Sequence, residues 1–378
     1  MYASDFTQWN AARMGPKRDV IGEIAQAARA HGLHFGLSSH RAEHWWFYSG
    51  GRRFNSDVND PRNAGLYGPA QRMALPGDPS GEEPDPSHLE RWLPPDQPFL
   101  DDWLARSTEL VDKYQPELFY FDWWIGQPAF VPYRQRMAAY YYDRAAAWGK
   151  GVVLTAKDFD FPENAAVLDV ERGKLDGLRL LPWQSDTSVS VKSWGYVEHD
   201  TYRTPKSLIA ELVDVVSKNG NFLLNVGPKS DGTIPDEVRE VLLAMGQWLS
   251  VNGEAIFGSR PWMVYGEGPT SDAASHTMGN DAQSYSAQDI RFTTKGDTVY
   301  AIALGWPEDG KLTIHTLWEG TPYLSAITQI ELLGSTAKLR WQQSKEGLTI
   351  SLPPTKPNDT AYVFRISGTG AAGTAKTN

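Results

Sequence analysis

The chain has 378 residues, enough for one large domain and a smaller one, and its 41% hydrophobic and 22% charged residues are ordinary for a globular protein. The net charge is −10 and the pI about 5.3, so the chain lacks the excess of basic residues that binds nucleic acid or an anionic membrane, and neither is an expected partner. The absence of cysteine excludes disulfides, thiol nucleophiles and thiolate metal sites, and no apolar run is long enough to span a bilayer.

Strands that alternate with helices are predicted for the first two thirds of the chain. The helices are expected from residue 19 to 31, 99 to 114, 133 to 148, 205 to 219 and 235 to 249. Thr204 followed by Pro205 is typical of a helix N-cap with proline at the first helical position. A long loop rich in Pro, Gly and Asp is expected between about residues 50 and 98. The strands are expected at 33–38, 117–122, 152–155, 166–171, 178–183 and 221–226.

This alternation predicts parallel strands joined by right-handed crossovers, and therefore a (β/α)8, or TIM-like, barrel. Six strands are two fewer than a closed barrel needs. We therefore expect residues 1–265 to form an incomplete catalytic barrel domain, with its active site at the carboxyl ends of the strands.

The character of the sequence changes after residue 265. Short runs with period-two alternation and intervening turn residues predict a small antiparallel β-sandwich over residues 266–367. Residues 368–378 contain a literal G-x-G-x-x-G that opens no helix, so we expect a disordered tail. The runs that predict strands are 290–293, 299–304, 312–314, 348–352 and 361–366.

Asp122 ends a continuously apolar and aromatic run that starts at Leu118. Such a run is typical of a buried strand that brings a carboxylate to the rim of a sheet. Trp123 and Trp124 follow at once, and aromatic faces beside a carboxylate suit a sugar, whose anomeric carbon an Asp can attack or stabilise. The segment is equally compatible with an Asp that caps a helix after a core strand.

The segment from His40 to His44 spells H-x-x-E-H, a pattern in which two histidines bind zinc and the glutamate acts as a base. That chemistry needs a helix that places both imidazoles on one face, whereas this segment directly follows a predicted strand. In the barrel interpretation His40, Glu43, His44 and Trp45 line a sugar pocket at the rim. The structural alternative is a loop in which His and Glu pair with each other.

A set of specific motifs runs along the chain: Gly15-Pro-Lys-Arg-Asp-Val-Ile-Gly, Phe35-Gly-Leu, Phe121-Asp122, Ser193-Trp-Gly-Tyr, residues 212–228, Asp231-Gly-Thr-Ile-Pro and Asn252-Gly-Glu-Ala-Ile. Together these motifs resemble the glycoside hydrolase family 29 α-L-fucosidases. The similarity covers about residues 13–262 and continues weakly into the predicted β-sandwich.

The resemblance implies a retaining exo-α-L-fucosidase without a metal or organic cofactor, acting on fucosylated oligosaccharides or glycoconjugates. Asp122 matches the nucleophile and Glu171 matches the general acid/base of some relatives. Other relatives use a Glu directly after a Trp, where this chain has Gln184. Glutamine cannot donate and recover a proton, so Glu171 is the expected general acid/base. The structural alternatives for Glu171 are an ion pair with Arg172 or an acid that merely ends a strand.

Further substrate contacts are implied by the same resemblance. Trp194 matches an aromatic wall that packs against the C6 methyl group of fucose, and Lys157 falls where relatives place an Arg near the nucleophile. Trp123 and Gln184 complete the expected set of substrate-binding residues.

Family members begin with two further strands that carry His-Trp-Gly and His-His-Asp-Gly motifs. This chain starts downstream of both, which agrees with the six predicted strands, so a truncated catalytic domain is expected. The alternatives are a catalytically impaired fragment, a fucose-binding protein, or a zinc hydrolase that uses His40 and His44. Relatives are usually exported, so a secreted or periplasmic location is expected, although the first residues show no signal-peptide pattern.

Overall fold

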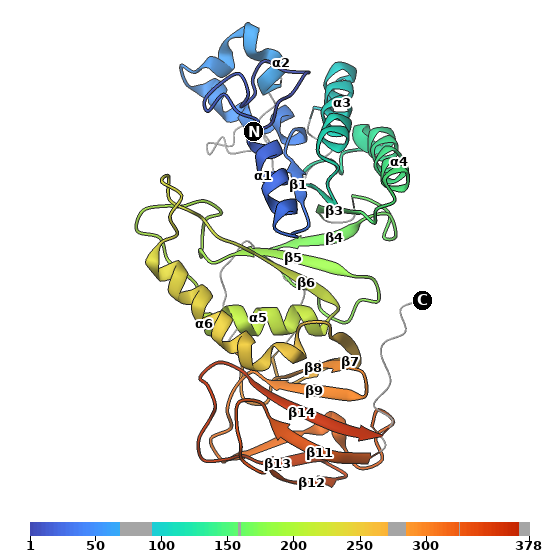
Figure 1. The fold of residues 1–378 in the computed structure, drawn as a ribbon, viewed down its shortest axis with the longest axis vertical. Helices are drawn as coiled ribbons and strands as arrows, with labels where there is room; N and C mark the ends of the chain where they lie inside the picture. Colours follow the sequence, from blue (N-terminus) through green and yellow to red (C-terminus); the bar gives the residue numbers. More distant parts are fainter. Residues whose placement is uncertain (69–92, 158–159, 271–284, 325, 370–378) are drawn as a thin grey trace, which may run out of the picture. The chain divides into compact units, whose positions relative to one another are not determined.

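The computed structural model describes residues 1–68, 93–157, 160–270, 285–324 and 326–369 (Figure 1). Two compact units are present, residues 1–168 and residues 169–378. Residues 69–92 of the predicted long loop and residues 370–378 of the predicted tail lie outside the described residues. The predicted domain boundary at residue 265 stays a prediction.

The central sheet has six strands, and their order in the sheet follows the sequence. The pairs β1–β2, β2–β3 and β5–β6 are parallel. The described residues therefore contain the predicted incomplete barrel of the TIM type. The strands are β1 (Gly36–Ser39), β2 (Leu118–Phe121), β3 (Val153–Lys157), β4 (Val167–Glu171), β5 (Trp183–Ser188) and β6 (Gly220–Asn225).

The sequence prediction for the fifth strand, residues 178–183, is wrong by five residues. The apolar run there is not a buried strand, since Leu180 is 54% exposed. Strand β5 instead buries the hydroxyl side chains of Ser185 and Thr187. The Ser185 hydroxyl donates to the Gly173 carbonyl (2.7 Å), which offsets the cost of burying it. A strand with a buried polar face gives no apolar pattern in the sequence.

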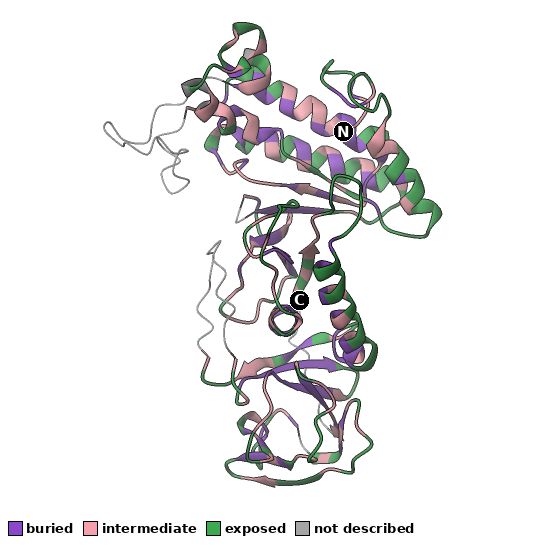
Figure 2. Ribbon diagram, turned by 90° about the vertical axis from the view of Figure 1, so that its left-hand side faces the viewer, coloured by how far each residue is buried: buried purple, intermediate pink, exposed green. Residues whose placement is uncertain are grey.

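The first unit packs α1 (Val20–Ala30), α3 (Gln97–Tyr114) and α4 (Val131–Trp148) with β1 to β3 around an aromatic core that includes Trp103, Phe119 and Phe121. Each long helix carries both buried and exposed residues, as expected of amphipathic helices (Figure 2). The Asp96 side chain caps α3 by accepting from the Phe99 amide (2.9 Å). No helix among the described residues is long and apolar enough to cross a membrane.

Short elements connect β1 to α3 and β2 to α4 in this unit. Among the described residues of these connections, they are η1 (Ala42–Trp45), η2 (Phe47–Arg53), η3 (Asp57–Asn59), η4 (Pro61–Asn63), α2 (Ala64–Tyr67) and η6 (Pro128–Phe130).

The second unit contains α5 (Pro205–Ser217), α6 (Asp236–Asn252) and two antiparallel sheets. The predicted N-cap is confirmed, because the Thr204 hydroxyl accepts from the Ser207 amide (3.2 Å) at the start of α5. The larger sheet has the order β11-β14-β9-β8-β7 and the smaller has the order β10-β13-β12. The strands are β7 (Arg260–Glu267), β8 (Ile290–Lys295), β9 (Thr298–Ala303), β10 (Lys311–Ile314), β11 (Ala326–Leu332), β12 (Arg340–Ser344), β13 (Gly347–Ser351) and β14 (Tyr362–Thr369).

Strand β9 shows how the larger sheet is covered on both faces. Val299 and Ala301 pack with β10 and β13 of the smaller sheet, as the predicted β-sandwich requires. Tyr300 and Ile302, which point to the opposite face, pack with α5 and α6 (Figure 1). The sandwich is therefore confirmed, and its outer face is buried under helices.

Strands β7, β11 and β12 are absent from the sequence prediction. All three lie at the edges of their sheets. Strand β12 is mostly exposed, with no buried residue. Edge strands have one unpaired side and less need for an apolar pattern, which explains why the sequence did not reveal them.

A buried charge network ties α5 to β8 in the second unit. The Asp214 carboxylate accepts from Lys218 Nζ (2.9 Å) and from Arg291 Nε (2.6 Å), and all three side chains are at most 1% exposed. Lys218 also donates to the Leu175 carbonyl. Burial raises the pKa of Asp214, but the charges of Lys218 and Arg291 outweigh it and hold that pKa below its ordinary value.

Replacement of Asp214 by Asn is expected to lower the free energy of unfolding of this unit by about 3–5 kcal/mol, because it leaves buried cations without their carboxylate. Denaturant titration followed by circular dichroism measures the change. The matched control is Asp359→Asn, at an exposed ion pair with Lys356, which should leave the unfolding midpoint where it is. Equal midpoints for the two variants would show that the buried network does not stabilise the unit.

Candidate active site

Three polar side chains emerge at one level from the carboxyl edge of β1, β2 and β3. Ser39 pairs with Phe121, and Phe121 pairs with Ala156. The next residue on each strand is His40, Asp122 or Lys157. The register of the sheet thus brings together residues that are far apart in the sequence, at the edge where barrel enzymes carry their active sites.

Asp122 is the centre of this group. Its Oδ1 accepts from the Trp123 amide (2.8 Å) and from the Tyr120 hydroxyl (3.4 Å), and its Oδ2 lies 3.3 Å from His40 Nδ1. The side chain keeps 19% of its surface exposed, so it remains accessible to a small molecule. The alternative of a helix-capping Asp is wrong, since the next helical element in the described residues begins only at Pro128.

His40 joins Asp122 to Glu43. Its Nδ1 lies 3.0 Å from Glu43 Oε1, and this hydrogen bond is the main reason why the pKa of His40 is raised. Burial and the charge of Lys157 oppose the shift, whereas the charges of Glu43 and Asp122 add to it. One ring nitrogen of His40 and one carboxylate oxygen from each of Glu43 and Asp122 lie within 4.8 Å of one another.

His44 has a different set of contacts. Its Nδ1 lies 3.3 Å from the Leu66 carbonyl oxygen and 3.3 Å from Arg41 Nη1. Burial, and then the positive charge of Arg41, lower the pKa of His44 to about 4. The two histidines of the H-x-x-E-H segment therefore have different surroundings, although the sequence pairs them.

Arg41 anchors the segment that carries these side chains. It donates to Asp102 of α3 (2.8 Å) and to the Gly65 carbonyl (3.0 Å), and its guanidinium stacks on the Phe99 ring. Since Arg41 itself is buried, the backbone on either side of it is held against α3. His40 and Glu43 are thus presented from a supported turn.

The remaining predicted residues of the first unit have distinct surroundings. Trp45 is buried in the aromatic core, packs on Phe99 and donates its indole N–H to the Leu93 carbonyl (2.8 Å). Lys157 is 1% exposed, and its ammonium lies 5.7 Å from the centre of the Trp123 ring. Lys157 also lies close to the Tyr120 ring, so a cation and two aromatic rings flank Asp122.

The predicted residues of the second unit lie on β4, on β5 and in the loop after β5. Glu171 ends β4 and is half-buried. Gln184 of β5 donates to Asp169 (2.7 Å), whose carboxylate is fully buried two residues before Glu171. Asp169 and Glu171 therefore share one face of β4.

Arg172 holds the loop that carries Trp194. Its guanidinium donates to the carbonyl oxygens of Ser190 (3.2 Å), Val191 (3.2 Å) and Ser193 (2.8 Å). The same group stacks on the Trp194 ring, 4.3 Å from its centre. Arg172 has a positive φ of 45°, which directs it away from the path of β4.

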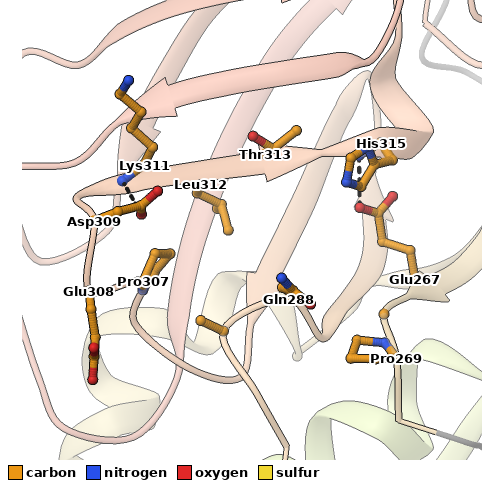
Figure 3. Close-up of a pocket in the computed structure, with 12 residues that line it drawn as sticks. Glu267, Pro269, Gln288, Pro307, Glu308, Asp309, Lys311, Leu312, Thr313 and His315 are labelled. Atoms are coloured by element: carbon orange, nitrogen blue, oxygen red, sulfur yellow. Dashed lines mark hydrogen bonds between the residues drawn. The ribbon is translucent and has the colours of Figure 1, made fainter.

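A separate cavity of about 760 Å³ lies in the β-sandwich (Figure 3). Its lining includes Lys311, His315 and Glu267. The Glu267 carboxylate accepts from the amides of His315 and Thr316, so it holds the short helix η8 (His315–Leu317) in place. None of the residues predicted for the active site is in this lining.

Comparison with known proteins places the chain in a family. The sequence profile described as Alpha-L-fucosidase matches residues 1–254, more than half of the chain. The chain belongs to the alpha-L-fucosidase family. The profile of the alpha-L-fucosidase C-terminal domain matches residues 282–367, which overlaps the β-sandwich.

Relatives within this family of glycoside hydrolases align along nearly the whole chain. An alpha-L-fucosidase of Branchiostoma floridae is 29% identical over 384 residues, covering 95% of this chain and 70% of the relative. The tissue alpha-L-fucosidase of Homo sapiens is 29% identical over 368 residues, covering 95% and 67%. The crystal structure of Thermotoga maritima alpha-fucosidase in complex with fucose superposes with a TM-score of 0.68 at 26% identity, covering 97% of this chain and 72% of that one.

The roles of three polar residues of the site region were missed by sequence reasoning. Tyr120 and Asp169 lie two positions before Asp122 and Glu171, so the period of two in a strand could have identified both. Nothing in the sequence indicated the role of Arg172, because this role depends on a left-handed backbone conformation and on carbonyl groups of another loop.

Replacement of Arg172 by Ala is expected to free the loop at residues 190–197. Three hydrogen bonds from a charged group contribute about 1.5 kcal/mol or more each, and about 1.4 kcal/mol is tenfold in an opening equilibrium. Amide hydrogen exchange in this loop should therefore quicken by at least about tenfold. Arg179→Ala, which removes an exposed contact to the Pro182 carbonyl, is the control. The assignment fails if exchange is the same in both variants.

Proposed function

We propose that this protein is a retaining exo-α-L-fucosidase that hydrolyses terminal α-L-fucosyl linkages of oligosaccharides or glycoconjugates. The observation that carries the proposal is the Asp122 carboxylate at the end of β2, with its donors and the neighbouring His40. Membership of the alpha-L-fucosidase family supports the same substrate class.

Asp122 acts as the nucleophile in this proposal. Donors to Oδ1 favour the anionic form of the carboxylate and fix its plane, which leaves Oδ2 to attack the anomeric carbon. A bond forms between Asp122 and the anomeric carbon while the bond to the leaving oxygen breaks, giving a covalent fucosyl-enzyme intermediate. Water then attacks the same carbon and releases Asp122 with fucose in its original configuration.

Glu171 acts as the general acid and then as the general base. Its carboxyl proton goes to the leaving oxygen in the first step, and its carboxylate takes the proton of the attacking water in the second. Gln184 cannot perform this exchange, because an amide neither donates nor recovers a proton at neutral pH. It donates instead to Asp169, which supports a positioning role beside Glu171.

Most of the other predicted residues bind the sugar in this proposal. His40, Glu43 and His44 offer hydrogen bonds to the hydroxyl groups, and Lys157 contributes positive charge near Asp122. The aromatic faces of Trp123 and Trp194 receive the apolar parts of fucose. Trp45, which is buried, supports the segment that carries His40 and Glu43.

Replacement of Asp122 by Asn should lower kcat/KM for an aryl α-L-fucoside by several orders of magnitude, on the order of 10³–10⁵-fold, because the amide is a poor nucleophile. Product stereochemistry, followed by NMR in the wild type, should show net retention. Asp122→Gly with added azide should restore aglycone release, since a small anion can then occupy the vacated space. Fucose binding without any turnover in the wild type would instead identify a fucose-binding protein.

Replacement of Glu171 by Gln should be most harmful for substrates with poor leaving groups. Alkyl and glycosyl leaving groups need protonation, so their turnover is expected to fall by about 10²–10⁴-fold. An activated aryl fucoside, which leaves without a proton, should lose much less in its first step. Trp194→Ala, which removes a ring that the proposal assigns to sugar binding, is the control and should show no dependence on the leaving group. The same dependence in both variants would remove Glu171 from the acid/base role.

A further inference from the structure

The three groups around His40 have the chemistry of a metal site as well as of a sugar site. One imidazole nitrogen and two carboxylate oxygens, from His40, Glu43 and Asp122, all lie within 4.8 Å of one another. Imidazole and carboxylate are the ligands that zinc takes in proteins that lack cysteine at the site, and three protein ligands leave a fourth position for water.

The distances match the size of the ion. Zinc binds nitrogen and oxygen ligands at about 2.0–2.2 Å, so a tetrahedral arrangement separates neighbouring ligand atoms by roughly 3.3–3.6 Å. His40 Nδ1 lies 3.0 Å from Glu43 Oε1 and 3.3 Å from Asp122 Oδ2. These two distances are therefore close to those between ligand atoms around a bound zinc ion, and the third pair of ligand atoms, from Glu43 and Asp122, lies within 4.8 Å.

The supports of the three ligands also favour a defined site. Asp122 is held by hydrogen bonds to its other oxygen, Oδ1, so Oδ2 keeps its orientation. Glu43 lies in η1, on the segment that Arg41 anchors to α3. His40 is 51% exposed, which gives an ion access from solvent.

His44 does not belong to this group, although the sequence pattern pairs it with His40. Its Nδ1 lies beside Arg41, whose positive charge would repel a metal ion, and its ring packs against Tyr48. The ligand set that the structure offers is therefore His40, Glu43 and Asp122, which differs from the set of a zinc hydrolase of the H-x-x-E-H type.

We propose that His40, Glu43 and Asp122 bind a zinc ion reversibly, and that the bound ion inhibits the enzyme. The two carboxylates neutralise the charge of the ion, and Oδ2 of Asp122, once bound to zinc, is no longer available to attack the anomeric carbon. The zinc is an inhibitor that competes with the sugar. Only the inhibition, and not the binding of zinc, rests on the proposed role of Asp122.

The test uses the full chain, first treated with EDTA and then freed of chelator, at about pH 8. Titration with zinc chloride is followed by calorimetry, and the same zinc concentrations are applied to hydrolysis of an aryl α-L-fucoside. We expect one zinc ion per chain, inhibition over the same concentration range, recovery with EDTA, and weaker zinc binding in the presence of L-fucose.

The two histidines provide a matched pair of variants. His40→Ala should weaken zinc binding by at least about tenfold, and His44→Ala by less than about twofold. Glu43→Gln, which keeps the size of the side chain and removes its charge, provides a second loss of binding if His40→Ala does not fold. Thermal unfolding of each variant shows whether it is folded.

Each result decides between the proposals. Absence of saturable zinc binding to the wild type, or equal weakening by His40→Ala and His44→Ala, would overturn the zinc site. Activation by zinc would overturn the inhibition and favour a zinc hydrolase. A wild type that binds zinc as described but hydrolyses no fucoside without it would leave the zinc site standing and contradict the proposed function.

Discussion

The candidate site depends above all on the register of three parallel strands. Because Ser39, Phe121 and Ala156 are aligned, His40, Asp122 and Lys157 leave the sheet at one level. A slip of one residue would turn each side chain to the opposite face of the sheet. Phe119 and Phe121 are fully buried in the aromatic core, and a slip would remove them from it. The same strand register therefore packs the core and places the Asp122 carboxylate at the edge of the sheet.

The second unit is organised by another consequence of strand geometry. The period of two along β9 gives one apolar face to the sandwich and the other to α5 and α6. The charges of Asp214, Lys218 and Arg291 lie between α5 and β8, where the Asp214 carboxylate forms an ion pair with each of the two cations. Helices of the barrel type and a β-sandwich thus share one hydrophobic core and one buried network, and both of these include residues from before and after position 265.

A site suited to sugar hydrolysis resembles a metal site for physical reasons. Stabilising a positive charge that develops on a sugar requires carboxylates, and orienting them requires a donor such as imidazole. These groups are also the ones that a divalent cation prefers. Sugar sites and metal sites differ in the spacing of these groups. Here the short distances from His40 Nδ1 to the carboxylates of Glu43 and Asp122 suit an ion as well as a hydroxyl group.

The sequence by itself determined the alternation of strands and helices, the six parallel strands, the N-cap at Thr204 and the family, because periodicity, capping and motifs are local properties of the chain. It also singled out Asp122, the acid at the end of a buried aromatic strand.

The sequence misplaced β5, because the buried hydroxyl of Ser185 on this strand is compensated by the Gly173 carbonyl, a partner distant in the sequence. Only the tertiary structure decided which histidine of the H-x-x-E-H segment lies beside Asp122. Residues four apart share a face in an α-helix, but here Ala42–Trp45 form a short 3₁₀ helix, in which His44 contacts Arg41 and the Leu66 carbonyl, while His40 contacts Glu43 and Asp122.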